Sequence, residues 1–190
     1  MEIGLIISLA VVLFSIFYLV MLYNGLTSLK HAVSKHLANI DVLLKQRHDE
    51  LPKLIETCKQ YMKHEQETLS KVITARQQVS VAQSNHDMIA LGQAETNLRA
   101  STGQLFALAE NYPELKADSS FAALQNRISE LENAIADRRE VYNEAVNNNN
   151  VRIEQFPDVI IARWFRFHAF DLLKFAKSEV QDVDIKSLFN

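Results

Sequence analysis

The sequence predicts an all-α protein with a single N-terminal transmembrane helix, an antiparallel up-and-down four-helix bundle and a C-terminal amphipathic aromatic segment. The 190 residues include only 4 glycines and 3 prolines, too few turn residues for a many-stranded β fold. Apart from Glu2, the N-terminal residues are uncharged and mostly apolar, and beyond them apolar residues recur at helical spacing. We therefore expect an anchor at 1–23, a bundle at 24–155 and an aromatic, basic interfacial segment with its tail at 156–190.

The apolar run at residues 3–23 is long enough to cross a membrane. Only Gly4, Ser8 and Ser15 interrupt it. As a helix at ~1.5 Å per residue it rises about 31 Å, which matches a hydrocarbon core of about 30 Å. A cleaved signal peptide needs a basic start, a shorter apolar stretch and an Ala-x-Ala-like site, and none of these is present. We therefore expect a retained, single-pass anchor.

The basic residues near the span favour one orientation. Lys30 and Lys35 follow the span, whereas no Lys or Arg precedes it. Because positive residues are retained on the cytoplasmic side, a cytoplasmic body is favoured over a periplasmic one.

Two amphipathic helices are expected after the anchor. The apolar positions of the first are Leu26, Leu29, Val33, Leu37, Ile40, Leu44 and Leu51. Those of the second are Leu54, Cys58, Tyr61, Leu69, Val72 and Val79. Pro52 lies between the two patterns, and Asp49 is placed to cap a helix that includes it, so a turn or sharp kink is predicted at 49–52.

Two more helices follow the polar break at 83–87. The third repeats through Met88, Leu91, Leu98, Leu105, Ala109 and Tyr112. The fourth repeats through Phe121, Leu124, Ile128, Leu131, Ile135, Arg138, Tyr142, Val146 and Ile153. Gly92 and Gly103 either weaken the third helix or let a neighbour approach closely. The asparagines at 147–150 leave fraying, a kink or an intersubunit contact open, and the short connections favour antiparallel packing.

The segment after the fourth helix is expected near the membrane, because alternate helices of an up-and-down bundle run back toward it. Six of the ten phenylalanines and the only tryptophan lie in 156–190, interleaved with Arg and Lys, as in interfacial segments. The membrane-interface candidates are Phe156, Arg163, Trp164, Phe165, Arg166, Phe167 and Phe170. The alternative is that these aromatic residues plug the open end of the bundle.

Four charged residues interrupt the apolar stripes and are candidates for a polar bundle seam: Arg47, Glu65, Arg76 and Arg138. Such residues either pair across the core, as Glu65 and Arg138 would, or lie at its edge with the aliphatic stem buried.

No motif for catalysis, cofactor binding or metal binding is found. His64-Glu65 begins the zinc-protease pattern, but position 68 is Thr, so the second metal ligand is missing. Neither a Gly-rich phosphate loop nor a nucleophile elbow is present. A net charge of −3 does not indicate nucleic-acid binding, and the single Cys58 excludes an internal disulfide. We expect a protein that is not an enzyme.

Several motifs resemble the signature of the LemA family. They include Leu51-Pro52, Lys63-His64-Glu65, Ala75-Arg76, Leu115-Lys116-Ala117, Tyr142-Asn143 and Phe156-Pro157. The resemblance covers about residues 23–175. It implies a bacterial inner-membrane protein with one span, a helical bundle and no known enzymatic activity, in a family that includes a magnetosome-membrane protein. The chain departs from the family at Leu37, usually Trp, at Asn149, usually Tyr, and at Arg166, usually Gly.

These features together predict a membrane-anchored helical scaffold that self-associates or organises partners or membrane at the cytoplasmic membrane. The expected partners are the lipid bilayer and further copies of the chain, and another membrane protein is a candidate partner. The alternative function is an accessory or docking subunit of a membrane protease or an envelope-stress system.

Overall fold

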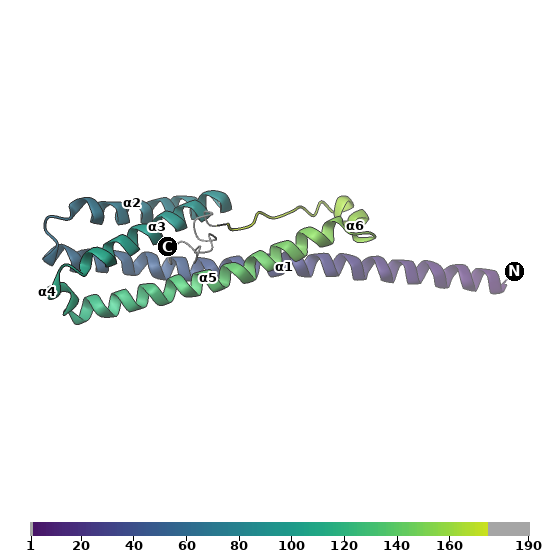
Figure 1. Ribbon diagram of the computed structural model, residues 1–190. Coiled ribbons are helices and arrows are strands. Elements are labelled where there is room, and N and C mark those ends of the chain that lie inside the picture. Colours follow the sequence, from purple (N-terminus) through teal and green to yellow (C-terminus); the bar gives the residue numbers. More distant parts are fainter. Residues whose placement is uncertain (1, 175–190) are drawn as a thin grey trace, which may run out of the picture. The chain divides into compact units, whose positions relative to one another are not determined.

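A computed structural model describes residues 2–174 of the chain, and the described part contains helices and no strands. The helices are α1 (Glu2–Tyr61), α2 (Gln66–Ser84), α3 (Met88–Ala109), α4 (Pro113–Lys116), α5 (Ser119–Glu154) and α6 (Asp158–Trp164) (Figure 1). The all-α prediction is confirmed. Residues 175–190 of the predicted tail lie outside the described residues, and the domain boundaries after 23 and 155 stay predictions.

Helix α1 runs without interruption through Pro52, so the predicted turn at 49–52 is wrong. A proline inside a helix has no N–H for the carbonyl four residues earlier, which here is that of His48. Arg76 of α2 donates from Nε to this carbonyl oxygen at 3.0 Å. The helix continues because a side chain from another helix replaces the missing backbone donor.

The first break in the chain comes instead at residues 62–65. The N–H of Met62 still donates to the carbonyl of Cys58 at 2.8 Å, and the Met62 side chain is fully buried. The two tyrosines near this turn donate to carboxylates: Tyr61 to Asp118 at 3.0 Å and Tyr112 to Glu65 at 3.1 Å. Tertiary contacts therefore fix this boundary.

The turn between α2 and α3 is built without glycine. His86 has a φ of 54°, in the left-handed region. The N–H of His86 donates to the carbonyl of Gln83, and the N–H of Asp87 donates to the carbonyl of Ala82. These two hydrogen bonds form the Schellman pattern of a helix end. Asp87 then caps α3 by accepting from the N–H groups of Ile89 and Ala90 at 3.1 and 2.9 Å.

Replacing His86 by glycine is expected to raise the free energy of unfolding by about 1 kcal/mol, because glycine adopts a positive φ without the Cβ clash. His86→Ala is the matched control, since it removes the imidazole and keeps the Cβ. Urea unfolding of the full chain in detergent measures both variants. An equal gain in both would attribute the effect to the imidazole rather than to the backbone.

The contacts divide the chain into two compact units. Among the described residues, the first unit comprises 2–42 and 136–172, and the second comprises 43–135 and 173–174. In the second unit α2 packs along α3 (Figure 1). Its buried apolar residues include Leu44, Leu51, Leu54, Cys58, Leu69, Val72, Val79, Leu91, Leu98, Leu105, Phe121 and Ile128. All twelve occupy apolar positions predicted from the helical spacing.

Gly92 lies in this second unit, where the backbone of Lys174 crosses α3. A Cβ added at Gly92 would lie 2.0 Å from the carbonyl oxygen of Lys174. Of the two readings of this glycine, close approach of a neighbour is the one the structure supports. The open space around Gly103 shows no such approach.

Candidate functional site

The N-terminal part of α1 exposes a long apolar surface. Its large apolar side chains from Ile3 to Met21 are 43–75% exposed. Among the described residues, α1 is the helix that is long and apolar enough to cross a membrane. An exposed apolar surface of this extent needs lipid or protein to cover it.

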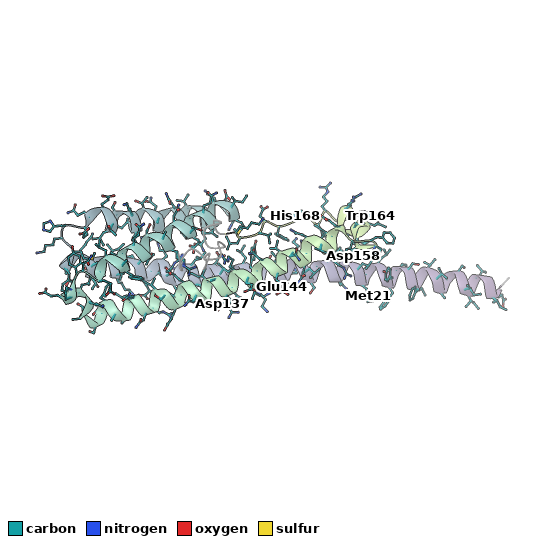
Figure 2. All side chains as sticks on the ribbon, in the orientation of Figure 1. Met21, Asp137, Glu144, Asp158, Trp164 and His168 are labelled. Atoms are coloured by element: carbon teal, nitrogen blue, oxygen red, sulfur yellow. The ribbon has the colours of Figure 1, made fainter. Side chains whose placement is uncertain are left out.

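Helix α6 packs against α1 where the apolar run ends. Leu22 and Leu26 of α1 form a buried cluster with Ile161 and Ala162 of α6. Tyr23 also makes edge-to-face contacts with Phe165 and Phe167, at centroid distances of 4.8 and 5.9 Å. Figure 2 shows Trp164 at the end of α6, alongside the stretch of α1 that carries Met21. The aromatic segment therefore meets the end of the predicted span.

The seven membrane-interface candidates differ in their exposure. Phe167 and Phe170 are half-buried. The other five are exposed: Phe156, Arg163, Trp164, Phe165 and Arg166. Phe156 and Trp164 reach 81% and 79% exposure. Large aromatic side chains thus remain uncovered beside the apolar run.

Arg166 occupies a strained backbone position at the end of α6. Its φ is 57°, and the N–H of Phe167 donates to the carbonyl of Ala162 at 2.9 Å, which again closes a helix in the Schellman pattern. The left-handed conformation agrees with the glycine that the LemA resemblance implies at this position. This chain keeps the conformation with an arginine.

Residues 167–172, here called the strap, follow α6 as an extended chain held by α5. The amide of Asn150 donates to the carbonyl of Phe170 and its oxygen accepts from the N–H of the same residue, both at 2.9 Å. Asn149 donates to the carbonyl of His168 at 3.3 Å, and the Tyr142 hydroxyl donates to that of Asp171 at 2.9 Å. The asparagine run therefore continues α5 and binds the strap.

Asn150→Ala is expected to release the strap, because both backbone groups of Phe170 lose their partner. Two hydrogen bonds at about 1 kcal/mol each predict a loss of roughly tenfold to a hundredfold in hydrogen-exchange protection at the Phe170 amide. Asn147→Ala, at an exposed position of the same run, is the matched control. Unchanged protection in Asn150→Ala would contradict the assignment.

The polar seam candidates occupy different environments. Arg47 is 2% exposed and forms an ion pair with Glu95, which is 3% exposed. Glu65 is half-buried and accepts from Tyr112, and Arg76 is half-buried against His48. Arg138 is exposed on α5.

Sequence reasoning missed Glu95 and the last two asparagines of the run, of which Asn149 is buried and Asn150 is half-buried. Glu95 stands at a helical step between Leu91 and Leu98, at a position where the apolar pattern of α3 has a gap. Asn149, 1% exposed, likewise stands between Val146 and Ile153. A polar residue inside an apolar repeat is the signal that could have found both.

His48 makes the stability of the second unit depend on pH. Its pKa is lowered chiefly by burial and next by the Arg76 guanidinium, whose Nη2 lies 2.6 Å from Nε2. Because the unfolded chain binds this proton more tightly, stability should be full above pH ~6.5 and fall as the pH drops below it. Urea unfolding between pH 5 and 8 measures this, and His48→Gln should flatten the dependence. If the free energy of unfolding of His48→Gln changes with pH as in the unmodified chain, other groups cause the dependence.

Among residues 2–174, no group of three or more His, Cys, Asp or Glu side chains is placed to hold a metal ion. The apolar, aromatic and basic surface of the first unit is the candidate site, and its chemistry suits lipid or protein contact.

Comparison with known proteins identifies relatives. The model of the LemA family matches residues 36–186. Magnetosome proteins MamQ 1 and MamQ 2 of Paramagnetospirillum magneticum strain AMB-1 are each 32% identical to the chain over 68 residues, which are 36% of this chain and 25% of each relative. The match thus spans a quarter of the length of these curated relatives. Because the family match covers most of the chain, the protein belongs to the LemA family.

Proposed function

We propose that the protein is a non-enzymatic helical scaffold, anchored in the bacterial cytoplasmic membrane by residues 3–23, that organises itself or partners there. The observation that carries this proposal is the exposed apolar surface of α1, which ends beside the exposed aromatic and basic residues of α6. The family relationship agrees with it, because the similar MamQ proteins are named as magnetosome proteins.

The aromatic end of the first unit supports a second contact with the bilayer. If the aromatic segment closed the open end of the bundle, its rings would be buried. Phe156 and Trp164 are instead largely exposed. Tryptophan and arginine are typical of the interface between hydrocarbon and water. We place α6 at the boundary between the hydrocarbon and the headgroups, with Trp164 toward the lipid.

The second unit is proposed to act as an antiparallel four-helix bundle on the cytoplasmic side and to carry the contacts between copies. Anchoring confines the chain to the membrane plane and raises its effective concentration, so weak lateral contacts are sufficient for assembly.

Sidedness is tested with an engineered cysteine. The natural Cys58 is unsuitable because it is fully buried, and burial raises the pKa of its thiol to about 11. A Cys58→Ala chain carrying Ser129→Cys, at an exposed position of α5, is treated with a membrane-impermeant maleimide. Labelling only after the cytoplasmic membrane is opened supports the proposal, and labelling of intact spheroplasts contradicts it.

Assembly is tested by the size and symmetry of the detergent-extracted particle, combined with crosslinking in native membranes. A homomeric particle supports the scaffold. Monomers without crosslinks contradict it, and one stoichiometric partner would instead favour the docking-subunit function.

A further inference from the structure

We propose that the first unit binds an anionic phospholipid, with one acyl chain in an apolar groove and the phosphate in an adjoining basic pocket. The proposal rests on the proposed anchoring of α1, because the groove includes residues of the span. It assigns a specific ligand to the surface where α1 and α6 meet.

The groove has a volume of about 380 Å³, and its walls are almost entirely apolar. It is lined by Leu19, Val20, Tyr23, Ile160, Ile161, Trp164 and Phe165. A ligand in this groove would contact hydrocarbon and aromatic side chains and make almost no hydrogen bonds. These contacts suit an acyl chain.

The basic pocket has a volume of about 260 Å³ and shares Tyr23 and Phe165 with the groove. Its polar and ionisable lining residues, besides Tyr23, are Thr27, Lys30, His31, Arg166 and His168, and no Asp or Glu lines it. The Thr27 hydroxyl oxygen is buried and has no hydrogen-bond partner within the described part of the chain. These groups are complementary to a phosphate, with charge from Lys30 and Arg166 and a donor from Thr27.

The depth of the two cavities agrees with one amphipathic ligand. Tyr23 ends the apolar run, and Thr27 and Lys30 follow it by about 6 and 10 Å along a helix that rises ~1.5 Å per residue. The headgroup layer extends about 5–8 Å beyond the hydrocarbon on each side. The groove therefore lies at acyl-chain depth and Thr27 lies at headgroup depth. The backbone of Lys30 lies just beyond the headgroup layer, and its long side chain can reach back into it.

Arg166 supplies a separate line of support. A non-glycine residue in the left-handed region is strained, and such strain is concentrated at functional sites. The positive φ of Arg166 places a cation in the lining of the pocket at a position where glycine would be unstrained. Binding of an anionic headgroup gives that arginine a function.

Trp164 provides the readout, since it is the only tryptophan of the chain and lines the groove. The full chain is incorporated into phosphatidylcholine vesicles that contain the same minor fraction of either acyl-brominated phosphatidylglycerol or acyl-brominated phosphatidylcholine. Quenching by bromine measures how often each lipid occupies the groove. We expect the anionic lipid to quench preferentially.

The variants Lys30→Gln and Arg166→Gln should each lower this preference about threefold to fivefold, as expected for one cation near a phosphate. Lys59→Gln, an equal charge change at an exposed position of the second unit, is the control and should keep the preference. Inorganic phosphate, added to the same vesicles, separates a free anion from a lipid headgroup.

Three results would overturn the proposal: equal quenching by both lipids, an unchanged preference in both pocket variants, or loss of the preference with millimolar phosphate, which would indicate a site for a free anion. Failure of the chain to enter the vesicles would instead contradict the proposed anchoring. Incorporation without a headgroup preference removes the lipid site alone.

Discussion

Replacing Glu95 by leucine is expected to lower the free energy of unfolding by about 3–5 kcal/mol, because it leaves the Arg47 guanidinium buried without its counter-charge. Both side chains are only 3% exposed, and they join α1 to α3. Arg47→Met should cost a similar amount, since it leaves the carboxylate of Glu95 without that ion pair.

The double variant Arg47→Met/Glu95→Leu is expected to recover most of this loss, because a well-packed apolar pair carries no desolvation cost. Urea unfolding of the full chain in detergent measures the free energy of unfolding of the unmodified chain, the two single variants and the double variant, which form a double-mutant cycle. Lys45→Met, which removes an exposed ion pair with Asp49 one helical turn further along α1, is the control and should cost less than about 1 kcal/mol. Additive losses in the double variant would contradict a coupled buried pair.

The spacing of apolar residues was sufficient to predict the all-α class and the buried stripe of α1. Leu26, Val33, Ile40, Leu44 and Leu51 are all buried as their spacing requires. A repeat at steps of three and four identifies the face of a helix that must be covered. It does not identify what covers that face.

This limit explains which parts of the site were missed. Arg47 was recognised as polar within a stripe, but Glu95, its partner, lies 48 residues away in the sequence. Asn150 meets Phe170 across 20 residues, and that contact depends on how the strap lies against α5. Long-range partners of this kind follow from tertiary packing, which the local pattern does not contain.

The helix boundary at 62–65 was missed for a related reason. Proline is the strongest local signal for a helix end, so the pattern predicted a break at Pro52. The cost of a proline inside a helix depends on whether its unpaired carbonyl finds another donor. Arg76, 28 residues from His48, provides that donor, and the effect can be measured.

Arg76→Met is expected to lower the free energy of unfolding by about 1.5–3 kcal/mol, the range for a hydrogen bond that involves a charged group. In a Pro52→Ala background the same substitution should cost less than about 1 kcal/mol, because the N–H of Ala at position 52 can donate to the His48 carbonyl as in any helix. Lys71→Met, which removes an exposed ion pair of α2, is the control for loss of a cation and should be nearly neutral in both backgrounds.

The difference between the two backgrounds isolates the carbonyl contact from the other contacts of Arg76. The contact of its Nη2 with the His48 imidazole is lost in both backgrounds and so cancels in the cycle. The remaining coupling of about 1–2 kcal/mol measures how far one guanidinium substitutes for a missing backbone N–H. If Arg76→Met costs the same with Pro52 as with Ala at that position, the arginine does not compensate for the proline, and the continuity of α1 through Pro52 requires a different physical cause.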